Sequence, residues 1–268
     1  MNESQKPIGI FDSGIGGLTV VKAIRNILPL ENIIYLGDTA RVPYGTRGRA
    51  TIIQFARELT ATINQFNPKI IVVACNTMSA VALQAIVAAA DVPVINVILP
   101  TIQAALMGKP KSLGVIGTSA TMRSGAYQQM IAKLSPSTRV HVQACPLFVP
   151  MIEEGMRNGP AAHLIAQTYL RSLKKERIQS LILGCTHYPL MRSTISKVIG
   201  RDVLIHDSAQ ATADTLKEIL SSKEILKKNG RGNCKIFLTD DPSWVKGLLP
   251  SLIGSNKCVV KKITLSAI

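Results

Sequence analysis

Apolar runs alternate with amphipathic segments along this chain, a pattern that predicts parallel strands joined by helices. Two runs stand out, at 70–73 and 181–183, because branched aliphatic side chains follow one another there without a polar interruption. Continuous runs of this kind are typical of strands buried on both faces of a parallel sheet. Each run leads through one small residue into a cysteine, Cys75 or Cys185, and then into a segment with helical periodicity. We therefore expect each thiol at the carboxyl end of a strand and the amino end of a helix.

The same alternation predicts the other elements. Further strands are expected at 6–11, 32–36, 92–98, 112–117, 203–206, 234–238 and 257–264, and helices at 18–28, 46–66, 79–90, 164–173, 208–220 and from 243 onward. Strands that alternate with helices in this way are typical of an α/β protein with parallel sheets.

The pattern of the first half returns in the second half. The first strands of the two halves are 105 positions apart, the two cysteines 110 and the last strands 110. A nearly constant offset over three elements indicates an internal duplication. It predicts two similar doubly wound parallel-sheet domains, 1–98 plus 208–268 and 99–207, with the active site in the cleft between them. The segment after 208 is too short for a domain of its own, so we expect it to pack back onto the first.

Composition narrows the class of protein. Hydrophobic residues make up 47% of the 268 positions and charged residues 18%, which describes a folded globular chain. No apolar run approaches the roughly 18 residues of a membrane span, and the first residues lack the apolar segment of an export signal. These features predict a cytoplasmic protein that does not associate with a membrane.

The net charge of +15 raises the question of nucleic-acid binding. The Lys and Arg residues are scattered, however, and aromatic residues account for only 4% of the chain. A basic surface alone supports only non-specific attraction. We interpret the charge as solvated basic faces that would also attract a small anionic substrate, and do not expect nucleic acid as a partner.

Five cysteines, at 75, 145, 185, 234 and 258, are an odd number at irregular spacing. In a chain without an export signal this predicts free thiols rather than a disulfide framework. Cys145, Cys234 and Cys258 are interpreted as buried core residues. The matching positions of Cys75 and Cys185 indicate a pair that acts together.

Two thiols on opposite walls of a cleft suit a two-base racemase, in which one removes a proton and the other returns one from the opposite side. A helix start can lower the pKa of a thiol from about 8.5 toward neutrality. Asp12, at the end of the strand expected beside the first cysteine, and His187, two positions after the second, are candidate proton carriers. No lysine motif indicates a pyridoxal phosphate site. Cys75, Cys185 and His187 could instead hold zinc with an open coordination position, which their spacing does not exclude.

Four separated motifs resemble those of the glutamate racemases, within the aspartate/glutamate racemase superfamily. They are F-D-S-G-I-G-G at 11–17, G-D-T-A-R-V-P-Y-G at 37–45, A-C-N-T at 74–77 and G-C-T-H-Y-P at 184–189. The segments 145–150 and 207–209 fit as well, so the resemblance covers nearly the whole chain. Aspartate racemases of the superfamily tend to carry a glutamate where this chain has His187, which favours glutamate as the substrate.

The resemblance implies a cofactor-independent enzyme without a metal that interconverts L- and D-glutamate and supplies D-glutamate for peptidoglycan. Cys75 and Cys185 would be the catalytic acid and base, assisted by Asp12 and His187. It also implies a set of substrate-binding residues: Asp12, Ser13, Tyr44, Gly45, Asn76, Thr77, Thr118, Thr121, Thr186 and His187. A glutamate of the pair 153–154, for which we take Glu153 as the candidate, would assist near the second thiol. The expected assembly is a homodimer.

Two alternatives to this function remain open at the level of sequence. The chain could be a racemase that acts on another acidic amino acid. It could also be a basic binding protein for nucleic acid or for enzymes that act on nucleic acid, with or without racemase activity.

Overall fold

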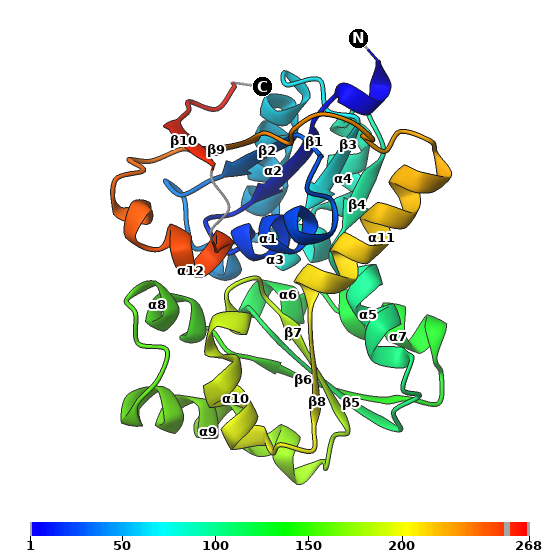
Figure 1. Cartoon of the computed structure of the whole chain (residues 1–268). Coiled ribbons are helices and arrows are strands. Elements are labelled where there is room, and N and C mark those ends of the chain that lie inside the picture. Colours follow the sequence, from blue (N-terminus) through cyan, green and yellow to red (C-terminus); the bar gives the residue numbers. More distant parts are fainter. Residues whose placement is uncertain (1, 255–257, 267–268) are drawn as a thin grey trace.

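The computed structural model describes residues 2–254 and 258–266, which form two parallel β-sheets surrounded by helices (Figure 1). The first sheet has the strand order β10-β9-β2-β1-β3-β4 and the second β6-β5-β7-β8. The first contains β1 (Ile8–Asp12), β2 (Ile33–Gly37), β3 (Ile70–Val73), β4 (Val94–Asn96), β9 (Cys234–Leu238) and β10 (Val259–Lys262). The second contains β5 (Ser112–Gly117), β6 (Arg139–Ala144), β7 (Ser180–Gly184) and β8 (Leu204–Asp207).

The helices lie between these strands along the chain. They are α1 (Leu18–Ile27), α2 (Arg49–Asn64), α3 (Asn76–Val81), α4 (Leu83–Ala89), α5 (Ile98–Leu106), α6 (Ser119–Arg123), α7 (Ala126–Leu134), α8 (Phe148–Glu153), α9 (Pro160–Lys175), α10 (Arg192–Ile199), α11 (Ser208–Ser222) and α12 (Leu249–Ile253). Short 3-10 turns are η1 (Glu3–Gln5), η2 (Tyr44–Thr46), η3 (Tyr188–Met191) and η4 (Trp244–Gly247). No helix within the described residues combines the length and the apolar character needed to cross a membrane.

The two sheets share one topology. The order β2-β1-β3-β4 in the first corresponds to β6-β5-β7-β8 in the second, and all these pairs are parallel. This confirms the predicted fold class of two similar parallel-sheet α/β domains. Strand β9 pairs with β2, so the C-terminal segment adds two strands to the first sheet. The domain limits, 1–98 plus 208–268 and 99–207, stay a prediction.

The central strands β1, β3, β5 and β7 are buried along their whole length, as their apolar runs predicted. Strand β6 was missed because its sequence, R-V-H-V-Q-A, alternates and lies only partly buried at an edge of the sheet. The predicted helix at 79–90 is two helices, α3 and α4, separated at Ala82, whose φ of −121° is not helical. The predicted last strand at 257–264 is β10, and its first position lies outside the described residues.

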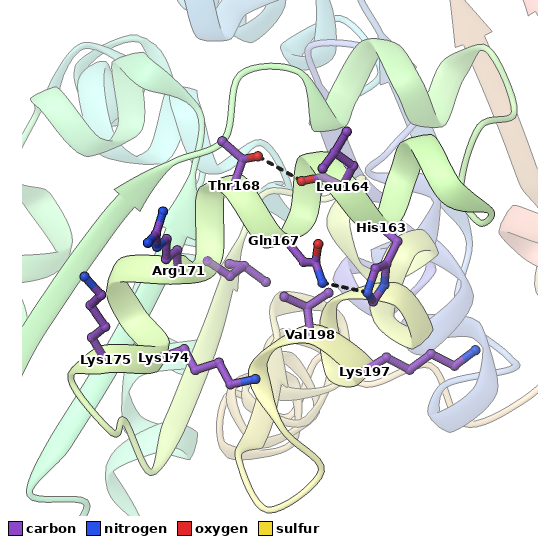
Figure 2. A pocket seen from close by; sticks show the side chains of 10 residues that line it. His163, Leu164, Gln167, Thr168, Arg171, Lys174, Lys175, Lys197 and Val198 are labelled. Carbon is purple, nitrogen blue, oxygen red and sulfur yellow. Dashed lines mark hydrogen bonds between the residues drawn. The ribbon is translucent and has the colours of Figure 1, made fainter.

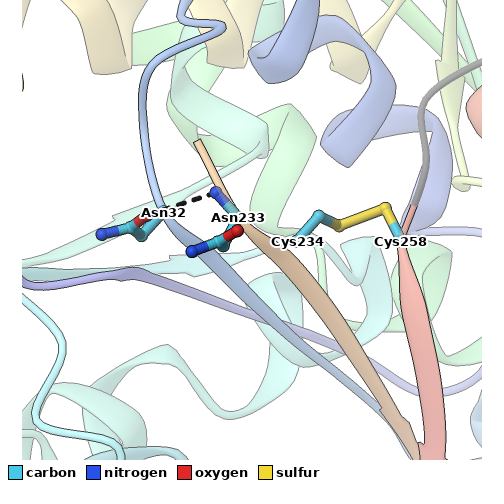
Figure 3. Close-up of a disulfide and its surroundings, with 4 residues drawn as sticks. All are labelled: Asn32, Asn233, Cys234 and Cys258. Carbon is cyan, nitrogen blue, oxygen red and sulfur yellow. Dashed lines mark hydrogen bonds between the residues drawn. A yellow bond between two sulfur atoms is a disulfide. The ribbon is translucent and has the colours of Figure 1, made fainter. Parts of the chain in front are cut away.

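The expectation that all cysteines are free thiols is wrong for two of them. Cys234 and Cys258 form a disulfide, with their Cα atoms 4.7 Å apart (Figure 3). The register of β9 and β10 pairs Lys235 with Val259, so the preceding residues stand side by side on neighbouring strands. Residue spacing cannot show that pairing, because it arises only when both tail strands join the sheet. Cys75, Cys145 and Cys185 are free and buried, so the core interpretation of Cys145 agrees with its place.

Candidate active site

A cavity of 240 Å³ lies where the carboxyl ends of the central strands of the two sheets meet. Cys75 follows β3 and Thr118 follows β5, whereas Cys185 follows β7, so both halves of the chain contribute to the walls. Ligands of open α/β sheets bind at these strand ends. The predicted residues that line the cavity are Ser13, Tyr44, Gly45, Cys75, Asn76, Thr77, Thr118, Cys185, Thr186 and His187. Asp12, Thr121 and Glu153 do not line it and lie behind residues that do.

Cys75 lies at the start of α3, where its sulfur accepts the N–H of Met78 at 3.5 Å and donates to the hydroxyl of Ser13 at 3.5 Å. We expected the helix start to lower the pKa of this thiol, but the structure shows the reverse. Burial, followed by the negative charge of Asp12, raises the pKa of Cys75 to about 12, and hydrogen bonds with Met78 and Ser13 offset only part of this. Cys75 is therefore a thiol at neutral pH.

Asp12 stands directly behind the first thiol. Strands β1 and β3 are neighbours, as predicted, and the side chain of Asp12 is completely buried. Its Oδ2 accepts the N–H of Gly17 at 2.8 Å, while Oδ1 has no hydrogen-bond partner within the described residues. A buried carboxylate oxygen without a partner is costly, so Oδ1 is left with an unused hydrogen-bond acceptor beside the first thiol.

The second thiol stands beside an imidazole and a carboxylate. Cys185 is followed by a turn and the 3-10 helix η3 rather than directly by an α-helix, and Pro189, which lacks an N–H donor, lies within that turn. The ring of His187 is buried, and its Nε2 lies 3.1 Å from Oε1 of Glu153. Burial lowers the pKa of His187, but hydrogen bonds with Cys185 and Glu153 overcome this and raise it to about 10. Of the adjacent glutamates, Glu153 is thus the one that contacts the site.

Hydroxyl and amide groups connect the two halves of the cavity. Thr77 lies 3.0 Å from Thr118 and 3.2 Å from Thr121, and the latter two are 2.9 Å apart, measured between Oγ1 atoms. Asn76 accepts the hydroxyl of Tyr127 at 2.7 Å through Oδ1. Three hydroxyl groups of the two halves are therefore hydrogen-bonded to one another at the cavity, beside the amide of Asn76.

The loop after β2 forms another part of the wall. Tyr44 and Gly45 line the cavity, and a Cβ on Gly45 would lie 2.5 Å from Cβ of Thr118 in the opposite half. Only glycine allows this approach. The hydroxyl of Tyr44 donates to Asp38, and burial together with the charge of Asp38 raises the pKa of Tyr44, so it remains a donor.

Sequence reasoning assigned no role to the apolar wall, formed by Pro146, Leu147, Val149 and Pro150. The motif at 145–150 was the sequence signal that could have indicated this wall. Within the described residues no group of three or more His, Cys, Asp or Glu side chains could hold a metal ion, so the set Cys75, Cys185 and His187 does not form the zinc site considered above.

A larger cavity of 560 Å³ lies away from the thiols, on the outer face of α9 and α10 (Figure 2). Its cations are Arg171, Lys174, Lys175 and Lys197. Three of them lie in the last turns of α9, where positive charge stabilises the helix end. The cavity contains neither of the two predicted catalytic thiols, and we do not assign it to the chemistry.

Comparison with known proteins agrees with this geometry. The family described as Asp/Glu/Hydantoin racemase matches residues 18–216. Glutamate racemase of Geobacter metallireducens is 43% identical over 98% of both chains, and that of Chlorobaculum tepidum is 48% identical over 94% of both. The crystal structure of glutamate racemase from Francisella tularensis in complex with D-glutamate superposes with a TM-score of 0.92 at 38% identity, covering 97% of this chain and 98% of that one.

The chain therefore belongs to the Asp/Glu/Hydantoin racemase family and is an amino-acid racemase. Within that family it falls among the glutamate racemases, the group to which all three of these similar proteins belong.

Proposed function

We propose that this protein interconverts L- and D-glutamate by a two-base mechanism in which Cys75 and Cys185 exchange protons with the α-carbon. The observation that carries the proposal is that both thiols, 110 positions apart in sequence, line one cavity of 240 Å³. The substrate is inferred from the relatives, because the similar structure from Francisella tularensis is a complex with D-glutamate.

The two thiols have different neighbours, and we assign them opposite roles, Cys185 as the base and Cys75 as the acid. His187, with a pKa of about 10, is protonated at neutral pH and lies beside Cys185. Cys75, with a pKa of about 12, holds its proton. In this state Cys185 takes the α-proton, forming an S–H bond and leaving the electron pair on carbon. Cys75 then gives its proton to the opposite face of the carbon.

The turnover leaves Cys75 as the thiolate and Cys185 as the thiol, and the same steps run backward from that state. Asp12 and the His187–Glu153 pair would return the protons between turnovers, so the enzyme works in both directions. No cofactor or metal takes part in the proposed steps. Preorganised hydrogen-bond donors must therefore stabilise the carbanion.

Substrate would be held by the groups predicted from the sequence. Ser13, Asn76, Thr77, Thr186 and the N–H groups at Gly45 would bind its carboxylates, with Tyr44 and Thr118 closing the cavity. Asp12 and Thr121, which do not line it, would act through Cys75 and through the other threonines. The apolar wall at 146–150 would exclude water from the carbanion.

The physiological role we propose is the supply of D-glutamate for peptidoglycan by a cytoplasmic homodimer, with no membrane or nucleic-acid partner. The proposed domains are 1–98 plus 208–268 and 99–207.

The test is isotope exchange in D2O. L-Glutamate should acquire deuterium at the α-carbon while it racemises, added pyridoxal phosphate should change nothing, and Cys75→Ala and Cys185→Ala should each abolish racemisation. Cys145→Ala is the matched control, because that thiol is buried in the same half of the chain as Cys185 but does not line the cavity. Racemisation that survives either cavity variant would refute the two-thiol mechanism. Faster turnover of L-aspartate would refute the proposed substrate.

A further inference from the structure

We infer that Thr239, in the segment after β9, is a positioning residue for the active site: it holds the buried carboxylate of Asp38, which in turn holds Tyr44 at the cavity wall. This rests on the proposed function, because it concerns the same cavity. Thr239 lies 201 positions from Asp38, and neither residue lines the cavity.

Asp38 is the centre of this arrangement. Its side chain is completely buried, and a buried carboxylate must be paired to be tolerated. Oδ2 accepts Nε of Arg41 at 2.6 Å and the hydroxyl of Tyr44, while Oδ1 accepts the hydroxyl of Thr239 at 2.9 Å. The carboxylate thus connects a residue of the C-terminal segment to a residue that touches the cavity.

Thr239 holds the loop after β2 through its backbone as well as its side chain. Its N–H donates to the carbonyl of Gly37 at 3.1 Å, and its Oγ1 accepts the N–H of Ala40 at 2.9 Å. The next residue, Asp240, donates its N–H to Oγ1 of Thr39 at 3.0 Å. Consecutive loop residues are therefore hydrogen-bonded to two consecutive residues of the C-terminal segment.

The other side of the loop rests on α2. Arg41 pairs with Asp38 and with Glu58, and its guanidinium lies 3.9 Å from the ring centre of Phe55. Tyr44 also packs on Phe55, with ring centres 5.2 Å apart. Helix α2 fixes the loop from one side and Thr239 from the other, so losing the Thr239 hydroxyl frees one side only.

The placement matters because the loop packs tightly against the opposite half at the cavity wall. Gly45 follows Tyr44 directly and lies against Thr118 of the opposite half. A small displacement of Tyr44 would change the donors offered to substrate, and misplacement by about 1 Å can cost on the order of 100-fold in rate. We expect the loss in substrate binding, since the loop does not carry the reacting atoms.

The experiment compares Thr239→Val with Thr239→Ser. Valine keeps the shape but leaves Oδ1 of Asp38 and the N–H of Ala40 without a partner, whereas serine keeps the hydroxyl. We expect Thr239→Val to raise KM for glutamate about tenfold with kcat within about twofold, and Thr239→Ser to restore KM. The control is Thr168→Val, an exposed threonine on α9 whose hydroxyl bonds to its own helix. An unchanged KM in Thr239→Val, or a raised KM that serine does not restore, would overturn the inference.

A second readout does not depend on activity. Amide hydrogen exchange followed by mass spectrometry should be about tenfold faster over residues 38–47 in Thr239→Val and unchanged in Thr168→Val. Unchanged exchange over 38–47 would overturn the inference even if the wild-type enzyme racemises glutamate. If exchange over 38–47 becomes faster in Thr239→Val but the wild-type protein does not racemise glutamate, the proposed function is refuted and the support of the loop by Thr239 is not. If Thr239→Val does not fold, Tyr44→Phe, which breaks the same chain of contacts at its other end, must show the raised KM and faster exchange.

Discussion

At the scale of single residues, burial decides the behaviour of the titratable groups. Cys75 and His187 are both nearly inaccessible, yet the first is held neutral and the second is held protonated. Burial and, after it, the charge of Asp12 keep the proton on Cys75, whereas hydrogen bonds with Cys185 and Glu153 overcome the effect of burial at His187. Two buried groups thus keep their protons at neutral pH for different physical reasons.

This predicts that the free energy of unfolding falls as pH rises. The pKa of His187 is about 10 in the folded protein and about 6.5 when unfolded, so its contribution is complete below pH 6.5 and is lost toward pH 10. The stability difference between wild type and His187→Gln should shrink by about 1.4 kcal/mol per pH unit within that window. Urea unfolding at pH 6, 7.5 and 9 measures it, with His163→Gln as the control. A difference that does not change with pH would contradict the pKa.

Glu153 and Glu154 offer a matched pair of variants. Glu153→Gln removes a negative charge from the ring of His187 and should lower the pKa of that imidazole, whereas Glu154 is exposed and forms no such contact. The alkaline limit of kcat/KM should therefore move to lower pH in Glu153→Gln and stay in place in Glu154→Gln. Equal pH profiles for the two variants would show that Glu153 does not set the protonation of His187.

At the scale of elements, the two strands of the C-terminal segment extend the first sheet beyond the duplicated unit. Thr239 directly follows β9, and the disulfide Cys234–Cys258 joins the first residue of β9 to the residue before β10. The support of the active-site loop therefore depends on an element that has no counterpart in the second sheet.

Reduction of this disulfide should destabilise the protein. The bond closes a loop of 24 residues, for which loss of unfolded-state entropy corresponds to about 3 kcal/mol. Dithiothreitol should lower the free energy of unfolding by roughly this amount in wild type, as measured in urea, and should have no effect on Cys258→Ser. Equal stability of reduced and oxidised wild type would argue against a structural role for the bond.

At the scale of the whole molecule, the two halves meet closely at glycines beside the cavity. A Cβ on Gly16 would lie 2.4 Å from Oγ1 of Thr186, and one on Gly45 would lie 2.5 Å from Cβ of Thr118. Both pairs join the first half of the chain to the second. The halves cannot come this close with any larger residue at either glycine unless the structure shifts.

Gly45→Ala should therefore hold the halves apart and lower kcat/KM by about 100-fold or more. The matched control is Gly48→Ala, three positions further along, where an added Cβ meets no atom within 4 Å. Steady-state kinetics and thermal unfolding of both variants test this. Full activity in Gly45→Ala would show that the contact with Thr118 is not needed during turnover.

Much of the fold was predictable from the sequence because its signals are local. The strands β3 and β7 are continuous apolar runs, and the repeated offset of the cysteines indicated the shared topology of the sheets. Strand β6 escaped detection because R-V-H-V-Q-A contains no continuous apolar run, and Glu153 could not be separated from Glu154. Glu153 is the last residue of α8 and Glu154 follows it, and only packing decides which of them meets His187.

Local patterns in the sequence indicated most of the strands and several of the helices, the repetition of the unit, and the motifs that follow the buried strands. These properties depend on neighbouring residues, whose side-chain volumes and hydrogen-bonding groups act along the chain. Only the tertiary structure decided that the thiols line one cavity, that burial keeps the proton on Cys75, that Cys234 bonds to Cys258 and that Thr239 supports Tyr44. Those properties arise from contacts between residues 24 to 201 positions apart and from the exclusion of water, neither of which a local pattern encodes.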